Sequence, residues 1–122
     1  MGFLSTHVLD TANGLPGHNI PISLYSVSKG EGNNESKLLL GTYTTNSDGR
    51  CDHALLEGDA FKVGVYELVF SVASYYRERG MQLPEPAFLD EVVLRFGISD
   101  AQEHYHVPLL ISPYSYSTYR GS

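Results

Sequence analysis

Hydrophobic and polar residues alternate along most of the chain, in short segments that are separated by clusters of turn-forming residues. Alternation with a period of two places every second side chain on one face, which is typical of a half-buried β-strand. The turn clusters are rich in Gly, Asn, Asp and Pro, as hairpin and loop connections require. The pattern predicts eight strands, over residues 3–10, 22–27, 38–44, 51–55, 62–70, 91–96, 104–111 and 114–120.

One segment departs from the alternating pattern. Residues 72–79 predict a helix of about two turns, which ends in basic residues and is stopped by Gly80. Eight short strands and one helix predict an all-β protein with a β-sandwich architecture. Since the 122 residues contain no linker or internal repeat, we expect residues 1–122 to form a single domain.

Composition and charge exclude several classes of function. Fourteen acidic residues against eight basic ones give a net charge of −6, and no basic run offers a surface for nucleic acid. The longest apolar runs are too short to cross a membrane, and the N-terminus lacks the features of a secretion signal. A single cysteine, Cys51, is typical of a reducing compartment. We therefore expect a cytoplasmic protein with no nucleic-acid or membrane partner.

The histidines are the first candidates for chemistry, because the chain has no phosphate loop, HExxH motif, CxxC pair or GxSxG elbow. His104 and His106 are two residues apart on a predicted strand, so both point to one face. From the residues alone, metal binding, a catalytic role and a polar surface all remain open for this pair. A histidine such as His7 in a strand is more commonly structural than catalytic, and His18 and His53 lie beside turns at the expected surface.

Two further features attract attention. Arg50 directly follows the Asp48-Gly49 turn, where its guanidinium can either pair with a surface carboxylate or form a fork on a carbonyl or ring. The chain ends in an aromatic, a cationic and a hydroxyl side chain directly after an alternating strand, at Tyr119-Arg120-Gly121-Ser122. Such an end is usually frayed, but these groups make this one less ordinary.

Three segments together resemble the transthyretin-like family. They are residues 5–11 with Gly14-Leu15-Pro16, the internal segment 45–50, and the C-terminal segments 104–110 and 112–122. The likeness spans nearly the whole chain and implies a transthyretin-like β-sandwich of two four-stranded sheets with one short helix. The terminal Tyr-Arg-Gly-Ser is specific to one branch of this family.

That branch hydrolyses 5-hydroxyisourate, an intermediate of urate breakdown, and needs no cofactor or metal. The polar residues that are typical of this branch correspond to His7, Arg50, His106 and residues 119–122 of this chain. The resemblance implies catalytic roles for His7, Arg50, His106 and Ser122, and substrate binding by His7, Arg50, Tyr119 and Arg120. It also implies a homotetramer whose active sites lie at the dimer–dimer interface.

Three alternatives stay open at the level of sequence. The first is a transthyretin-like carrier of small aromatic ligands, and the second is a structural sandwich domain that mediates protein contacts. The third is a zinc-dependent hydrolase, for which the His-x-His pair is the only support. The sequence also leaves open which histidine is the general base, and whether His104 acts through a hydrogen bond.

Overall fold

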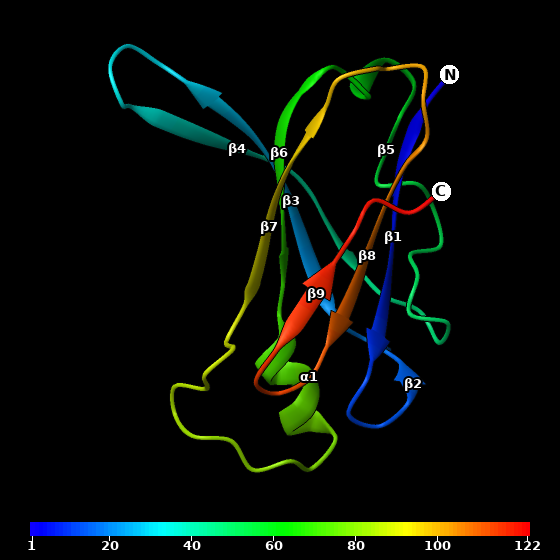
Figure 1. The fold of residues 1–122 in the computed structure, drawn as a ribbon, viewed down its shortest axis with the longest axis vertical. Coiled ribbons are helices and arrows are strands. Elements are labelled where there is room, and N and C mark those ends of the chain that lie inside the picture. The colour runs from blue at the N-terminus through cyan, green and yellow to red at the C-terminus, as the bar shows by residue number, and fades with distance from the viewer.

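The computed structural model describes residues 1–122 as two β-sheets with one α-helix near one end (Figure 1). The first sheet has the strand order β2-β1-β8-β9, with β5 also paired to β1, and the second has the order β4-β3-β6-β7. The strands of the first sheet are β1 (Phe3–Asp10), β2 (Leu15–Pro16), β5 (Leu56–Glu57), β8 (Tyr105–Ile111) and β9 (Tyr116–Thr118). Those of the second are β3 (Pro21–Lys29), β4 (Glu35–Thr44), β6 (Gly64–Phe70) and β7 (Val92–Ile98).

The predicted all-β sandwich is confirmed, with two corrections. The first sheet has five strands instead of four, because β5 pairs antiparallel with the start of β1. The strand expected over 51–55 is wrong, since that segment is a loop. Its backbone first bonds to β1 at its last residue, where Leu55 N–H donates to the Leu4 carbonyl. The predicted helix is confirmed as α1 (Val72–Glu78), followed by a left-handed Gly80 with φ +88°.

Alternation in β1 sorts its side chains between the core and the outer face. Its buried positions are Leu4, Thr6, Val8 and Asp10, and the positions between them are only partly covered or exposed. The buried face joins a core of 21 residues drawn from both sheets and α1. Since this apolar face fixes the register of β1, the residues between its core positions must face outward.

Asp10 ties the end of β1 to the helix. Its buried carboxylate accepts hydrogen bonds from the hydroxyls of Tyr75 and Tyr76 at 2.8 and 2.7 Å, and from the Asn13 amide at 2.7 Å. Burial raises the pKa of Asp10, but these hydrogen bonds outweigh it and hold the pKa below its usual value. Burial raises the pKa of Tyr75 most, and the hydrogen bond to Asp10 raises it further, to about 12.

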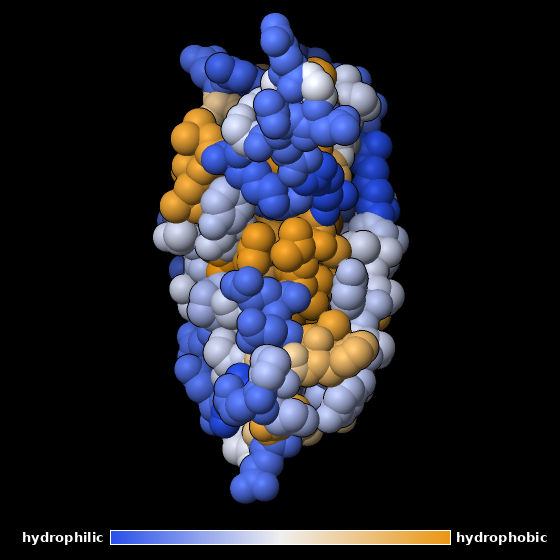
Figure 2. All heavy atoms as spheres, turned by 90° about the vertical axis from the view of Figure 1, so that its left-hand side faces the viewer, coloured by the Kyte–Doolittle hydropathy of each residue, from blue (hydrophilic) through white to orange (hydrophobic).

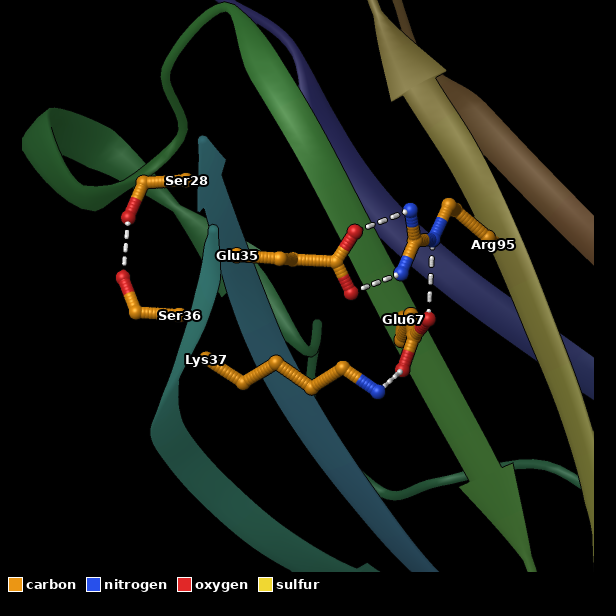
Figure 3. A network of polar contacts seen from close by, with 6 residues as sticks. All are labelled: Ser28, Glu35, Ser36, Lys37, Glu67 and Arg95. Atoms are coloured by element: carbon orange, nitrogen blue, oxygen red, sulfur yellow. Dashed lines mark hydrogen bonds and ion pairs between the residues drawn. The ribbon is translucent and has the colours of Figure 1, made fainter. Parts of the chain in front are cut away.

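An ion cluster crosses the outer face of the second sheet (Figure 3). Arg95 on β7 bonds through Nε to buried Glu67 at 2.9 Å and forks onto both oxygens of Glu35 on β4. Lys37 Nζ completes the set, 2.9 Å from the other oxygen of Glu67. These contacts connect β4, β6 and β7, so they hold the second sheet together without taking part in the histidine site on the first.

Candidate active site

The outer face of the first sheet brings together residues from its two central strands. On β1, Ser5 and His7 fall between buried positions, and on β8, His106 falls between buried Tyr105 and Val107. β1 and β8 run parallel in a register that pairs Ser5 with His106. Because opposite residues of paired strands share a face, this register places both histidines on one side of the sheet.

The turn after β4 delivers Arg50 to the same place. Arg50 forms an antiparallel bridge with His7, and Val8 N–H donates to the Gly49 carbonyl at 2.8 Å. The Asn46 side-chain oxygen closes the turn by accepting from the backbone N–H groups of Asp48 and Arg50. Gly49 has φ +77°, and a Cβ there would run into the Val8 carbonyl, so the turn requires glycine.

His7 is held in one tautomer by the backbone. Its Nε2 lies 2.9 Å from the Asp48 carbonyl oxygen, and since a carbonyl only accepts, Nε2 carries the proton. In the neutral ring the lone pair is therefore on Nδ1. Partial burial and the charge of Arg50 lower the pKa of His7, although the Asp48 carbonyl opposes them. His7 is consequently neutral at physiological pH.

His106 is also kept neutral, but its ring is oriented by a side chain. Its Nδ1 lies 2.8 Å from Ser5 Oγ, which leaves Nε2 without a partner in the chain. Burial lowers the pKa of His106 most, followed by the positive charge of Arg50 and by the neighbouring histidines 104 and 7. With its proton on Nδ1, a neutral imidazole whose Nε2 is unpartnered has the chemistry of a general base.

Arg50 differs from the other four arginines of the chain. Arg77, Arg95 and Arg120 form ion pairs, and Arg79 lies over the ring of Tyr75. The exposed Arg50 guanidinium has no such contact, and its charge acts on both His7 and His106. All of its donors are thus directed to solvent beside two neutral imidazoles.

The C-terminal residues pair with β8 again at His106, after a gap in the β8–β9 ladder. β8 and β9 pair as far as Leu109 opposite Thr118, and pairing resumes in the same register at His106 and Gly121. Pro108 lies in the gap and has no N–H to donate, which explains why β9 ends there. Gly121 N–H donates to the His106 carbonyl at 2.8 Å.

Gly121 lies directly against the imidazole of His106. A Cβ built on this glycine would be 2.6 Å from Cδ2 of the ring, so no larger residue fits without a shift. The next residue is the predicted catalytic Ser122, which is exposed and forms no hydrogen bond within the chain. Through Gly121, the fold places the terminal residue next to His106.

The Arg120 guanidinium contacts no histidine ring, although it donates to the backbone carbonyl of His104 at 3.4 Å. The guanidinium lies 4.1 Å from the ring centroid of the buried Tyr105 and forms an ion pair with Glu103 at 2.6 Å. Arg120 and Tyr119 both border a cavity of about 440 Å³ between β7 and β9. Figure 2, a view of the side on the left in Figure 1 where β7 lies, shows an apolar area in the middle of this face. The predicted substrate contacts of Tyr119 and Arg120 stay predictions.

Ser5 is the site residue that the sequence reasoning missed. Its Oγ contacts Nδ1 of His106 and Nε2 of His104, both at 2.8 Å. The available signal was its position two residues before His7, which puts both side chains on one face of the first strand. No group of three His, Cys, Asp or Glu residues is arranged to hold a metal ion. His18 and His53 are exposed, as expected.

Comparison with known proteins identifies the family of the chain. Residues 4–121 match the model of the HIUase/Transthyretin family. A relative from Pseudomonas aeruginosa named 5-hydroxyisourate hydrolase is 65% identical, over the whole of this chain and 93% of its own length. The solved structure of Klebsiella pneumoniae 5-hydroxyisourate hydrolase has a TM-score of 0.76 at 30% identity, with both chains fully covered.

A second solved structure, of (S)-allantoin synthase, has a TM-score of 0.90 at 46% identity. It matches 99% of this chain, which spans 44% of that longer one. The β-sandwich fold is thus shared with solved structures of two named enzymes. The chain belongs to the HIUase/Transthyretin family. None of its helices is long and apolar enough to cross a membrane.

Proposed function

We propose that the protein is a 5-hydroxyisourate hydrolase, which opens the six-membered ring of 5-hydroxyisourate in urate breakdown. The observation that carries the proposal is the outer-face site, where His7 and His106 are neutral beside the unpaired charge of Arg50. The full-length relative from Pseudomonas aeruginosa, at 65% identity, bears this name. The reaction breaks a cyclic amide and yields 2-oxo-4-hydroxy-4-carboxy-5-ureidoimidazoline.

His106 is the better placed of the two histidines to act as general base. Its Nε2 is unpartnered, whereas the Nε2 of His7 is occupied by the Asp48 carbonyl. In this role Nε2 of His106 takes a proton from water, which attacks the ring carbonyl. His7 then uses its Nδ1 lone pair to accept a hydrogen bond from the water or from a ring N–H, and so orients the reactants.

Arg50 supplies the positive charge that amide hydrolysis needs. As water adds, negative charge develops on the carbonyl oxygen, and a fixed donor there lowers the barrier. The guanidinium stays charged throughout and offers a planar fork of N–H donors. After burial, its charge is the next largest cause that lowers the pKa of both imidazoles, so one residue helps to prepare the base and stabilises the oxyanion.

The C-terminal residues have separate roles in the proposal. Ser122, held beside His106 by the pairing of Gly121, donates a hydrogen bond to the substrate or water. Tyr119 contributes a hydroxyl to substrate binding. Arg120 anchors the tail, which its ion pair with Glu103 and its stacking on Tyr105 support more strongly than direct contact with substrate.

The active form in this proposal is a homotetramer with sites at the dimer–dimer interface. The chain has three cavities, and none is lined by His7, Arg50 or His106. The site therefore lies open on the sheet surface, and a second copy facing it would enclose the substrate and exclude water. Light scattering is expected to give the mass of four chains, and a monomer would contradict this part.

A carrier of small aromatic ligands is the alternative within the same family. A carrier binds without turnover and is best served by an apolar channel, whereas the outer face here presents two imidazoles and a guanidinium. We propose a cytoplasmic location for either function, which the single cysteine supports. The polar face favours the hydrolase.

Replacement of the base tests the proposal. His106→Asn is expected to lower the rate of 5-hydroxyisourate decay about 10²- to 10⁴-fold, because it removes the proton acceptor. The matched control is His53→Asn, at an exposed loop position whose side chain forms no hydrogen bond with a site residue, which should keep the wild-type rate. Circular dichroism checks that both variants fold. Unchanged turnover in a folded His106→Asn protein would remove His106 from the mechanism.

A further inference from the structure

Ser5 forms a bridge between two histidine rings. Its Oγ lies 2.8 Å from Nδ1 of His106 and 2.8 Å from Nε2 of His104. The parallel register of β1 and β8 sets Ser5 opposite His106, and His104, just before β8, is positioned by stacking on Phe3 with ring centroids 3.9 Å apart. Both contacts therefore arise from fixed parts of the fold.

A hydroxyl in this position has only one proton to donate. If Ser5 donates to Nε2 of His104, it accepts from Nδ1–H of His106, and the neutral His106 carries its lone pair on Nε2. If Ser5 donates to Nδ1 of His106, His104 donates to Ser5, and Nε2 of His106 carries a proton. The first arrangement makes His106 a base and the second makes it an acid.

We propose that Ser5 is a positioning residue that couples His104 to His106 in a proton relay. As Nε2 of His106 takes a proton from the attacking water, the Nδ1 proton moves to Ser5 Oγ, and the Ser5 proton moves to Nε2 of His104. One proton enters the relay and one arrives at His104, so His106 stays neutral. The reverse movement returns the proton through Nε2 of His106 to the departing ring nitrogen. This inference rests on the proposed hydrolase function.

The surroundings of the two rings favour this direction of transfer. His106 is half-buried, and Arg50, His7 and His104 all oppose a positive charge on it. His104 is exposed to solvent, and its neighbour Glu103 brings an acidic group that is paired with Arg120. A charge moved from His106 to His104 thus passes from a cationic, partly desolvated place to a hydrated one.

The first test is spectroscopic and does not depend on activity. ¹⁵N NMR of labelled histidine reports which nitrogen of neutral His106 carries the proton. Ser5→Ala removes the partner of Nδ1 and is expected to shift this tautomer balance, whereas Ser5→Thr keeps the hydroxyl and the wild-type balance. Ser23→Ala, on β3 of the other sheet, is the matched control. An unchanged His106 tautomer balance in Ser5→Ala would overturn the inference, whatever the hydrolytic activity of the variant.

The second test is kinetic. Ser5→Ala is expected to lower kcat about 10- to 100-fold with little change in KM, as is typical when a positioning partner of a catalytic histidine is lost. Ser5→Thr should restore the rate, and His104→Gln should reduce kcat as Ser5→Ala does. The double variant Ser5→Ala/His104→Gln should be no slower than either single variant, because each single change already breaks the same relay.

Three results would contradict the relay. They are wild-type kcat in Ser5→Ala, equal loss in Ser5→Ala and Ser5→Thr, and additive losses in the double variant. A wild-type protein that hydrolyses nothing would instead sink the proposed function, while the NMR comparison would still decide whether Ser5 sets the state of His106.

Discussion

At the scale of single residues, the proposed mechanism assigns the chemistry to two imidazoles and one guanidinium. Each histidine has one nitrogen fixed by the chain, His7 by a backbone carbonyl and His106 by a hydroxyl. Arg50 has no partner of its own, and its charge bears on both rings. Burial and the neighbouring cation together lower the pKa of both histidines, which is what a base working near neutral pH needs.

Replacing Arg50 by Gln is therefore expected to change both rate and pH dependence. Loss of the oxyanion donor should lower kcat/KM about 10²- to 10³-fold. Without the guanidinium, protonation of His7 and His106 is less opposed, so the pKa of each should rise towards its ordinary value. The acid limb of the kcat/KM profile should then move to higher pH.

Histidine C–H titration by NMR measures the two pKa values directly. Arg77→Gln, which removes the same charge from the last turn of α1, where Arg77 pairs with Glu85, should leave the profile unchanged. An acid limb that stays in place in Arg50→Gln, or moves to lower pH, would show that Arg50 does not control the ionisation of the site.

At the scale of elements, the 46–50 turn does most to build the site. It presents the Asp48 carbonyl to His7 and carries Arg50 into the bridge with β1. Gly49 makes this possible, because its left-handed φ and its closeness to the Val8 carbonyl leave no room for a side chain. The outer face of β1 and β8 supplies the two histidines, and the turn supplies the positively charged Arg50 beside them.

Gly49→Ala is expected to lower both stability and activity. A left-handed φ costs an alanine about 1–2 kcal/mol, and the clash with β1 adds to it and displaces Arg50. Gly14→Ala is the matched control, since Gly14 has φ +68° with open space around it. Urea unfolding and kcat/KM should show the larger losses at Gly49. Equal losses in the two variants would mean that the close approach to Val8 is unimportant.

The sequence predicted elements better than it predicted contacts. Period-two alternation located β1 with its observed bounds, because one of its faces is buried. It failed over 51–55, where apolar residues reach the core from a loop, and it missed β2 and β5, which are too short to show a period. The Asp48 carbonyl could not be found from sequence, since every residue has one, and Ser5 gained its role only when β8 was placed beside β1.

At the scale of the whole molecule, the two sheets have different tasks. The ion cluster around Glu67 connects the strands of the second sheet, and the site histidines do not lie on this sheet. The first sheet turns its inner face to the core and its outer face, with the histidines, to the surroundings. An active site on an open sheet face explains why the proposal requires other copies of the chain to complete it.

The most direct test of the central claim is a spectrophotometric assay of the wild-type protein, with 5-hydroxyisourate generated from urate in the cuvette. Decay is followed with and without the protein, and with and without a chelator. The proposed mechanism predicts accelerated decay that survives chelation, since side chains of this chain supply the base and the cation. Decay no faster than the spontaneous rate, from a folded tetramer, would contradict the hydrolase and favour a carrier, and acceleration abolished by the chelator would contradict a mechanism based on His106 and Arg50 alone.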